Sequence, residues 1–375
     1  MKLETVRQEA EKIWNTRDSS KLLDYLYENR AVFADEDTSL GYTYFLSAVD
    51  KDNLENYGRH GILFSADNLQ DSLRNVSSLR RAVHRIEWCE ETDPSSIISL
   101  MKNIGATAID LNWIIKASTL DSEYVLGRIS GRTDNLKKTE PQPYYYDPDA
   151  SYNGAQVAFV ICSNDEEELA EAEYYISRLF VPEGCEVSVL SILDAKSICS
   201  GYNEAIDASD AMYKVYMHHD VRILDRFFIY YILKIFSDDP QIGMIGMIGT
   251  KGLPKEGIMW DEDRFGAWIE SHVHTCVSLS RYPSEDTTEI GLADGFLLAT
   301  QKDLRWRDDL FDGWDFYDAS QCMEFHNRGY KVVVPYQEKP WCLHDCGYWN
   351  LDKHDEYREI FMKNYFSDTN RRNSS

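Results

Sequence analysis

The sequence has no long apolar run, no signal peptide and no excess of positive charge. No stretch reaches the ~18 apolar residues of a membrane-spanning helix, and the N-terminus lacks the apolar core of a secretory signal. The 39 Lys and Arg residues are outnumbered by 64 Asp and Glu residues, so the net charge is -25. This charge would repel the phosphates of nucleic acids and of anionic lipids. We therefore expect a cytoplasmic protein with no transmembrane segment and no nucleic-acid partner, while peripheral contact with a membrane stays open.

The sequence also has no cysteine pattern typical of a disulfide scaffold or a zinc finger. Its 8 cysteines are scattered over 375 residues, which indicates reduced thiols in a cytoplasmic protein. Residues 342–346 read Cys-Leu-His-Asp-Cys, but a second cysteine pair at zinc-finger spacing is absent, and this disfavours a structural zinc site. The length exceeds that of one ordinary core and predicts two domains.

The first 132 residues predict a mainly α-helical domain. Apolar residues recur there at spacings of three and four, beginning with Leu3, Val6, Ala10 and Ile13. The same pattern predicts helices over 97–104 and 111–117. Residues 133–153 are polar and rich in proline, which stops helices, and they predict a linker. Residues 367–375 are polar and predict a disordered tail.

Residues 154–366 alternate between apolar runs and amphipathic segments. The apolar runs predict strands over residues 155–162, 186–192, 212–217 and 242–249. The amphipathic segments predict helices over residues 169–179, from 200 onward, and from 223 to 233. This strand and helix order predicts an α/β fold with a mostly parallel sheet flanked by helices.

Two potential metal ligands, His218 and Asp220, stand two residues apart where the third predicted strand ends. Alternate residues of an extended chain point to the same side, so both side chains can face one ion. The carboxyl end of a strand in an open α/β sheet is also where such folds bind ligands. The alternative is a polar strand end whose side chains are solvated.

Several motifs, in order along residues 155–346, carry a family resemblance. They are Cys162-Ser163-Asn164, Ser200-Gly201-Tyr202-Asn203, His218-His219-Asp220, Ala293-Asp294-Gly295-Phe296, the segment 311–318, and His344. Together they resemble a GT-A fold glycosyltransferase of the family-2-like group, with the histidine-containing triplet at the DXD position. The resemblance implies a GT-A-like α/β domain that follows the helical one. His218 departs from the family pattern because it replaces the first acid of the triplet. Tyr317 and Ser320 also depart from it, because acids are usual in their places.

The resemblance implies a sugar transfer that depends on a divalent cation, Mn²⁺ or Mg²⁺. The implied metal ligands are Asp220, His218 and His344. Oxygen ligands suit both ions, and imidazole shifts the preference toward Mn²⁺. A bound cation would also allow a chain of net charge -25 to hold a diphosphate. For His344, the alternative is a buried histidine that is hydrogen-bonded to the backbone.

The resemblance further implies a catalytic base that takes the proton of the acceptor hydroxyl. Asp318 occupies the position of this base, and Asp315 is the second candidate. A single displacement with such a base would invert the anomeric configuration. Because Asp318 precedes a predicted helix over residues 319–327, the alternative is that it only caps this helix.

The same resemblance implies a site for a nucleotide-diphosphate sugar, with UDP as the expected nucleotide. The residues expected at this site are Cys162, Ser163, Asn164, Asp194, Asn203, His219, Asp294, Gly295 and Trp314. For Trp314, packing in the core is the alternative. The acceptor is expected to be a growing glycan, a lipid-linked sugar or a protein, and the helical domain is a candidate for its recognition.

Two other classes of protein remain as alternatives. A non-catalytic nucleotide-sugar or carbohydrate-binding protein on the same scaffold is compatible with Tyr317 and Ser320. A nucleotidyltransferase is disfavoured, because residues 163–166, Ser-Asn-Asp-Glu, form an acidic loop without the glycines and basic residues that hold a triphosphate.

Overall fold

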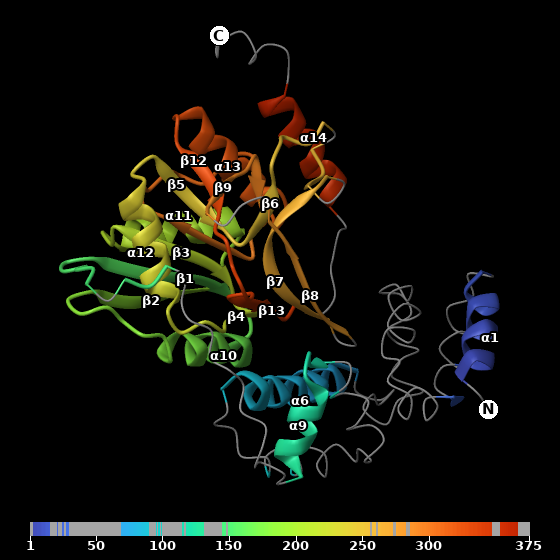
Figure 1. Cartoon of the computed structure of the whole chain (residues 1–375). Coiled ribbons are helices and arrows are strands. Elements are labelled where there is room, and N and C mark those ends of the chain that lie inside the picture. Colours follow the sequence, from blue (N-terminus) through green and yellow to red (C-terminus); the bar gives the residue numbers. More distant parts are fainter. Residues whose placement is uncertain are drawn as a thin grey trace. The chain divides into compact units, whose positions relative to one another are not determined.

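The structure of the chain is a computed structural model (Figure 1). The residues that it describes are 3–15, 21, 25, 28–29, 69–89, 95, 97, 99, 115, 118–130, 145–147, 149–255, 257–259, 262–272, 275–282, 286–346 and 353–366. The chain divides into two compact units, Met1–Thr139 with Glu270–Val277, and Glu140–Ile269 with Ser278–Ser375. The predicted tail and most of the predicted linker lie outside the described residues. Among the helices that the described residues form, none is both long and apolar enough to cross a membrane.

The first unit contains the helices α1 (Leu3–Asn15), α6 (Leu69–Cys89) and α9 (Ser122–Ile129). Helix α6 buries Leu79, Val83 and Ile86, which share one helical face. Helix α9 begins after its N-cap Asp121, whose backbone N–H donates to Oε1 of Glu87 on α6 at 2.9 Å. This bond ties the start of α9 to α6. The described residues of this unit are mostly helical, and most residues of the helices predicted over 97–104 and 111–117 lie outside the described residues.

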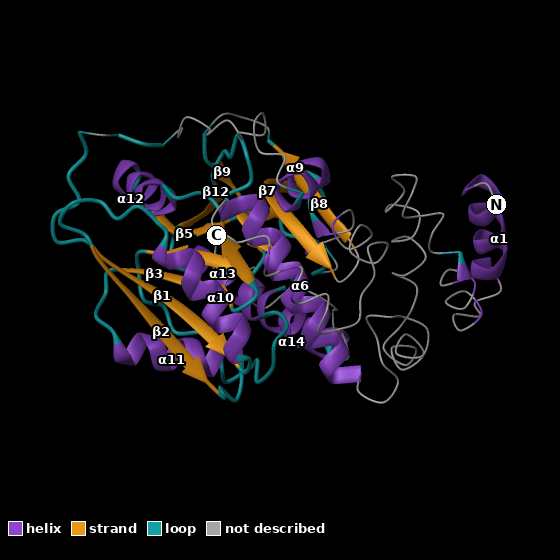
Figure 2. Ribbon diagram, turned by 90° about the horizontal axis from the view of Figure 1, so that it is seen from below, coloured by secondary structure: helices purple, strands orange, loops and turns teal. Residues whose placement is uncertain are grey.

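The second unit is built on a seven-stranded sheet (Figures 1 and 2). Its strands are β1 (Gln156–Ser163), β2 (Glu186–Leu193), β3 (Tyr213–His218), β5 (Ile242–Gly246), β9 (Thr288–Glu289), β11 (Leu297–Thr300) and β12 (Lys331–Val334). They lie in the order β2-β1-β3-β11-β5-β12-β9. Strand β1 pairs in parallel with β2 and β3, and β12 with β5, whereas β11 runs antiparallel to both of its neighbours. The sheet is therefore parallel in its first three strands and mixed beyond them.

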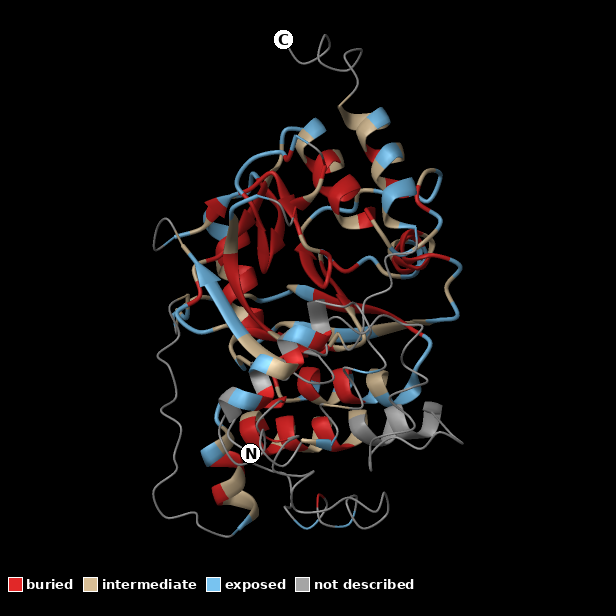
Figure 3. Cartoon of the chain, turned by 90° about the vertical axis from the view of Figure 1, so that its right-hand side faces the viewer, coloured by how far each residue is buried: buried red, intermediate tan, exposed pale blue. Residues whose placement is uncertain are grey.

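Helices cover both faces of this sheet because successive strand residues point to opposite sides. Phe159 and Ile161 of β1 pack with α10 (Glu166–Ser177) and α12 (Phe228–Asp238) on one face. Val160 and Cys162 pack with α11 (Ile198–Ala208), α13 (Tyr317–Asn327) and α14 (His354–Tyr365) on the other. Figure 3 shows that buried residues follow the central strands of the sheet and the inner sides of the helices, whereas the edge strand β2 has no buried residue. The predicted α/β fold with a sheet between helices is confirmed.

The second unit also contains strands of a six-stranded sheet, and several of them follow directly after strands of the first sheet in the chain. The six-stranded sheet contains β4 (Val221–Ile223), β6 (Ile248–Thr250), β7 (Arg264–His272), β8 (Thr275–Arg281), β10 (Leu292–Ala293) and β13 (Cys342–His344). Five of them lie in the order β10-β6-β7-β13-β4, and β8 pairs with β7. Two predictions are wrong here. The strand predicted over 242–249 is two strands, β5 and β6, in different sheets, and Ile223, predicted to be helical, lies in β4. Short apolar runs do not distinguish these alternatives, because pairing with distant strands decides them.

The chain passes from one sheet to the other at several points, and we call four of these connections the sheet seam. The seam consists of residues 219–220 between β3 and β4, 247 between β5 and β6, 294–296 between β10 and β11, and 335–341 between β12 and β13. Polar residues that the sequence singles out, among them Asp220 and Asp294, lie in these connections. The seam is therefore the part of the fold that positions the candidate site.

Candidate functional site

Three possible metal ligands converge at one end of the seam. His218 is the last residue of β3, Asp220 follows it in the turn to β4, and His344 is the last residue of β13. Strands β4 and β13 pair with His344 opposite Val221, and the backbone N–H of Asp345 donates to the carbonyl of Asp220 at 2.8 Å. One ligand atom from each of the three side chains lies within 4.8 Å of the others.

The electrostatics of this cluster fit a divalent cation. Oδ1 of Asp220 lies 3.5 Å from Nε2 of His344 and 3.8 Å from Nδ1 of His218, too far for well-formed hydrogen bonds. This buried oxygen accepts no hydrogen bond from the described residues. Burial tends to raise the pKa of Asp220, but His344, with smaller effects of His218 and His219, outweighs it and holds that pKa below its usual range. Burial lowers the pKa of His218 to about 4, so its imidazole is neutral at pH 7. One carboxylate and two imidazole nitrogens are a donor set that suits Mn²⁺.

A buried arginine holds the turn that carries these ligands. Nη1 of Arg222 donates to the carbonyl of His219 at 2.6 Å, and Nη2 forms an ion pair with Glu168 of α10. The Arg222 side chain is 1% exposed, so its charge is compensated by the carboxylate inside the protein. His219 is fixed a second time, by a hydrogen bond of 2.8 Å between its Nδ1 and Oγ of Ser163 at the end of β1. In the sequence, the only signal for Arg222 is its place between Val221 and Ile223 in a short apolar run.

Asp318 lies in the first turn of α13 and is bonded to the seam. Its Oδ2 accepts the backbone N–H of Gly295 at 2.9 Å, and its Oδ1 accepts that of Ala319 at 2.7 Å. Burial and the nearby charge of Asp294 raise the pKa of Asp318 to about 7, against the effect of these two donors. The N-cap of α13 is Phe316, so Asp318 is not the N-cap itself, but its carboxylate still accepts one N–H of the first turn, that of Ala319.

The first turn of α13 also reaches the metal-ligand cluster. The hydroxyl of Tyr317 is hydrogen-bonded to Nε2 of His218, with 2.5 Å between the two atoms. A Cβ atom at Gly295 would lie 2.0 Å from the same hydroxyl, so only glycine leaves room for it. The preceding residue, Phe316, has a φ of 59°, a left-handed conformation that is rare for a bulky residue and that sets the direction in which α13 begins.

Two predicted site residues have their side chains in the core instead. Cys162 is buried on the α11 side of β1, and burial raises the pKa of its thiol to about 12. Asn203 of α11 is bonded at both ends of its amide to the backbone of Trp306, each time at 2.9 Å. These amide bonds fix α11 to the loop that precedes α13.

Other predicted site residues lie at the surface around the strand ends. Asn164 and Asp194 follow β1 and β2, and both are exposed. Trp314 is 55% exposed, in the loop before α13, so the core alternative does not apply to it. Asp315 is half-buried in the same loop, and burial raises its pKa.

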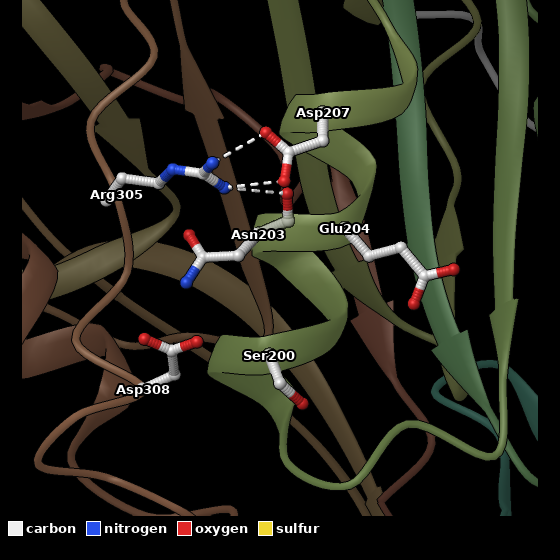
Figure 4. Close-up of a pocket in the computed structure, with 6 residues that line it drawn as sticks. All are labelled: Ser200, Asn203, Glu204, Asp207, Arg305 and Asp308. Carbon is white, nitrogen blue, oxygen red and sulfur yellow. Dashed lines mark hydrogen bonds and ion pairs between the residues drawn. The ribbon is translucent and has the colours of Figure 1, made fainter.

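A separate pocket of about 510 Å³ opens beside α11 (Figure 4). Its lining residues are Ser200, Asn203, Glu204, Asp207, Arg305 and Asp308. The guanidinium of Arg305 is already paired with Asp207 through contacts of 3.0 and 2.6 Å. The remaining carboxylates make this an acidic pocket, and it does not include the three clustered ligands or Asp318. It offers little to a diphosphate.

Comparison with known proteins gives a family match over this unit. Residues 158–365, more than half of the chain, match the model of a family described as "Glycosyltransferase like family". No curated protein sequence matches the chain.

Solved structures give weaker likenesses. The mannosyltransferase PcManGT from Pyrobaculum calidifontis, in complex with GDP-Man and Mn²⁺, is 13% identical, with a TM-score of 0.39, over 61% of this chain and 68% of that one. GalNAc-T7 with UDP, GalNAc and Mn²⁺ is 9% identical, with a TM-score of 0.36, over 59% of this chain and 58% of that one. S. aureus TarS 1-349 in complex with UDP is 9% identical, with a TM-score of 0.35, over 58% and 68%. Likenesses at this level do not identify a substrate.

Proposed function

The chain belongs to the glycosyltransferase-like family, and we propose that it transfers a sugar from a nucleotide-diphosphate sugar with the aid of a divalent cation. One observation carries this proposal. The ligand atoms of His218, Asp220 and His344 lie within 4.8 Å of one another, and Tyr317 joins this cluster to the helical turn that holds Asp318. A cation site and a candidate base thus share one end of the sheet seam.

The three ligands would hold Mn²⁺, or Mg²⁺ as the second choice. When bound, the cation would neutralise charge on the departing diphosphate. The lowered pKa values of Asp220 and His218 keep the carboxylate charged and the imidazole neutral at pH 7, the states in which both bind metal ions. The preference for Mn²⁺ follows from the two imidazole ligands. The Mn²⁺ named with two of the solved structures agrees with this choice.

Asp318 would act as the base that takes the proton of the acceptor hydroxyl. Its pKa of about 7 matches the requirement for a base that works near neutral pH. The N–H groups of Gly295 and Ala319 hold its carboxylate in a fixed direction. A single displacement with this base inverts the anomeric configuration. Asp315, three residues earlier, is the second candidate.

The donor is proposed to be a UDP-sugar that lies along the ends of β1, β2 and β3. Of the residues proposed for this site, Asn164, Asp194 and Trp314 are exposed, His219 and Asp294 are half-buried, and Ser163 and Gly295 are buried. The exposed ring of Trp314 offers a flat apolar face for a sugar. The acceptor is proposed to be a glycan, a lipid-linked sugar or a protein, and the site of action to be the cytoplasm, in keeping with 8 free cysteines.

A thermal-shift experiment tests the proposal. The full chain is heated with a panel of UDP- and GDP-sugars, each with and without Mn²⁺, and with Mn²⁺ alone. Ligands that bind the native state raise the free energy of unfolding by RT ln(1 + [L]/Kd) and thereby raise the unfolding temperature. We expect a rise that needs both Mn²⁺ and one nucleotide sugar and that is absent in Asp220→Ala. If Mn²⁺ and every nucleotide sugar leave the unfolding temperature unchanged, the proposal fails.

A transfer assay then separates an enzyme from a binding module. With the donor found above, the release of free nucleoside diphosphate is measured with simple sugar acceptors and with water. We expect the Asp318→Asn variant to keep the thermal shift and to lose turnover. Binding without turnover in the wild type, over a broad panel of acceptors, would favour a non-catalytic nucleotide-sugar-binding protein.

A further inference from the structure

The two ring nitrogens of His218 face two different partners. Nδ1 lies 3.8 Å from Oδ1 of Asp220, on the side of the metal-ligand cluster. Nε2 lies 2.5 Å from the hydroxyl of Tyr317, which is the first residue of α13. A neutral imidazole carries one proton, so the group that faces Nε2 decides which nitrogen offers a lone pair to a cation.

The hydroxyl of Tyr317 is held in place by the surrounding backbone. Tyr317 is 3% exposed, and its hydroxyl occupies the space that a side chain at residue 295 would fill. The backbone N–H of His218 is also fixed, because it donates to the carbonyl of Phe296 at 3.0 Å. Both partners of the Nε2 hydrogen bond are therefore anchored at the same connection of the seam, residues 294–296.

We propose that Tyr317 is a positioning residue for the metal site, accepting the Nε2 proton of His218 so that Nδ1 is the ligand atom. This inference rests on the proposed function, because it needs a cation at His218, Asp220 and His344. Groups that hydrogen-bond the second nitrogen of a ligating histidine fix its tautomer and ring direction, and removing one weakens metal binding about 10- to 100-fold. The role of Tyr317 is separate from that of Asp318, its neighbour in the same helical turn.

Tyr202 provides a matched control for this role. It is fully buried, and its ring packs edge-on against that of Tyr317, with 6.2 Å between the ring centroids. Its hydroxyl has no hydrogen-bond partner among the described residues. The Tyr202→Phe variant thus removes the same group from the same core without changing the surroundings of His218.

The test is a titration of the metal-free full chain with Mn²⁺, with the free ion measured by electron paramagnetic resonance. We expect Tyr317→Phe to bind Mn²⁺ about tenfold more weakly than the wild type, and Tyr202→Phe to bind it unchanged. The Tyr317→Phe change is then repeated in a His218→Asp background, where a carboxylate ligand has no ring nitrogen to orient. In that background we expect no further loss. If Tyr317→Phe does not fold, Gly295→Ala, which displaces the hydroxyl, takes its place.

The possible results separate the two proposals. If the wild type does not bind Mn²⁺, there is no metal site, and both the proposed function and this inference fail. Normal binding in the wild type and in Tyr317→Phe overturns only the inference. Equal losses in the wild-type and His218→Asp backgrounds also overturn it, because they indicate that Tyr317 stabilises α13 and does not act through His218.

Discussion

Asp220 and Asp318 are two half-buried aspartates at the same seam, and their surroundings move their pKa values in opposite directions. Asp220 lies between two imidazoles, which hold its pKa below the usual range. Asp318 faces another carboxylate, Asp294, and burial together with this charge raises its pKa to about 7. The chemical group is the same in both places, so the difference in pKa comes from the neighbouring groups and from burial. The first aspartate stays charged and suits a cation, and the second can take up a proton near neutral pH.

The largest expected effect is the loss of turnover when Asp318, the proposed base, is replaced. Asp318→Asn retains the size of the side chain and loses its capacity to take a proton, so we expect kcat to fall by about 10²- to 10⁴-fold. Mn²⁺ affinity, measured by titration, should stay within about twofold, because this carboxylate is not one of the clustered ligands. Asp315→Asn is the matched control. A collapse of kcat in the Asp315 variant with normal turnover in the Asp318 variant would transfer the role to Asp315.

The next largest effect is expected on Mn²⁺ affinity when Asp220 is replaced. Asp220→Asn removes the only carboxylate of the cluster, and we expect Mn²⁺ affinity to fall at least about a hundredfold, more than for loss of an outer group. Asp225→Asn serves as the control, because that carboxylate is bonded to the backbone N–H of Phe227 at 2.9 Å and to the hydroxyl of Tyr231. Mn²⁺ affinity is read by titration. Unchanged affinity in the Asp220 variant would show that the ion binds elsewhere.

Gly295→Ala should disturb the surroundings of both the metal-ligand cluster and Asp318. The added methyl would lie 2.0 Å from the Tyr317 hydroxyl, and the N–H of the same residue bonds to Asp318. Overpacking of this kind costs about 1–3 kcal/mol of unfolding free energy, which urea denaturation measures. Gly252→Ala, where a Cβ meets no atom within 4 Å and φ is not positive, is the control that adds a methyl group without a clash. Equal Mn²⁺ affinity and kcat in wild type and Gly295→Ala would contradict the shared anchoring.

The smallest effect is expected on the pH dependence of kcat, and it tests why the pKa of Asp318 is raised. In the wild type, turnover should rise as pH increases through about 7, because Asp318, the proposed base, can take a proton only when it is deprotonated. Asp294→Asn removes a like charge and should lower the pKa of Asp318, which moves this rise to lower pH by about one unit. The measurement is kcat against pH at saturating Mn²⁺ and donor. An unmoved profile would mean that Asp294 does not set the pKa of the base.

Many strands of the fold were predictable from the local pattern of apolar residues. The apolar runs locate β1, β2 and β3 to within about two residues. For β1 and β3 the reason is that buried strands of a sheet covered on both faces read as continuous apolar segments, whereas β2 lies at the edge of the sheet with no buried residue. The division between β5 and β6 was not predictable, because the chain stays apolar through Met247 while it changes sheets. The prediction of a helix at Ile223 was wrong for a related reason, because β4 is defined by its pairing with the distant strand β13.

The contacts that give the site its electrostatics are non-local. Gly295 and Asp318 are 23 residues apart, and His218 and Tyr317 are 99 residues apart. The sequence indicated His218 and Asp220 as a pair because they are neighbours on one strand end, and His344 only through a family resemblance. Tyr317 stood out merely as a departure from that family's pattern. Its partner became evident only once helix α13 was placed against the seam.

The seam gives ligand binding a mechanical consequence. His218 belongs to the seven-stranded sheet and His344 to the six-stranded one, so an ion that both of them bind links the two sheets directly. Sliding of one sheet past the other would then require the ion to lose a ligand. Amide hydrogens of β4 and β13 should accordingly exchange more slowly with solvent when the ion is present, while those at the far edge, in β2, keep their rates.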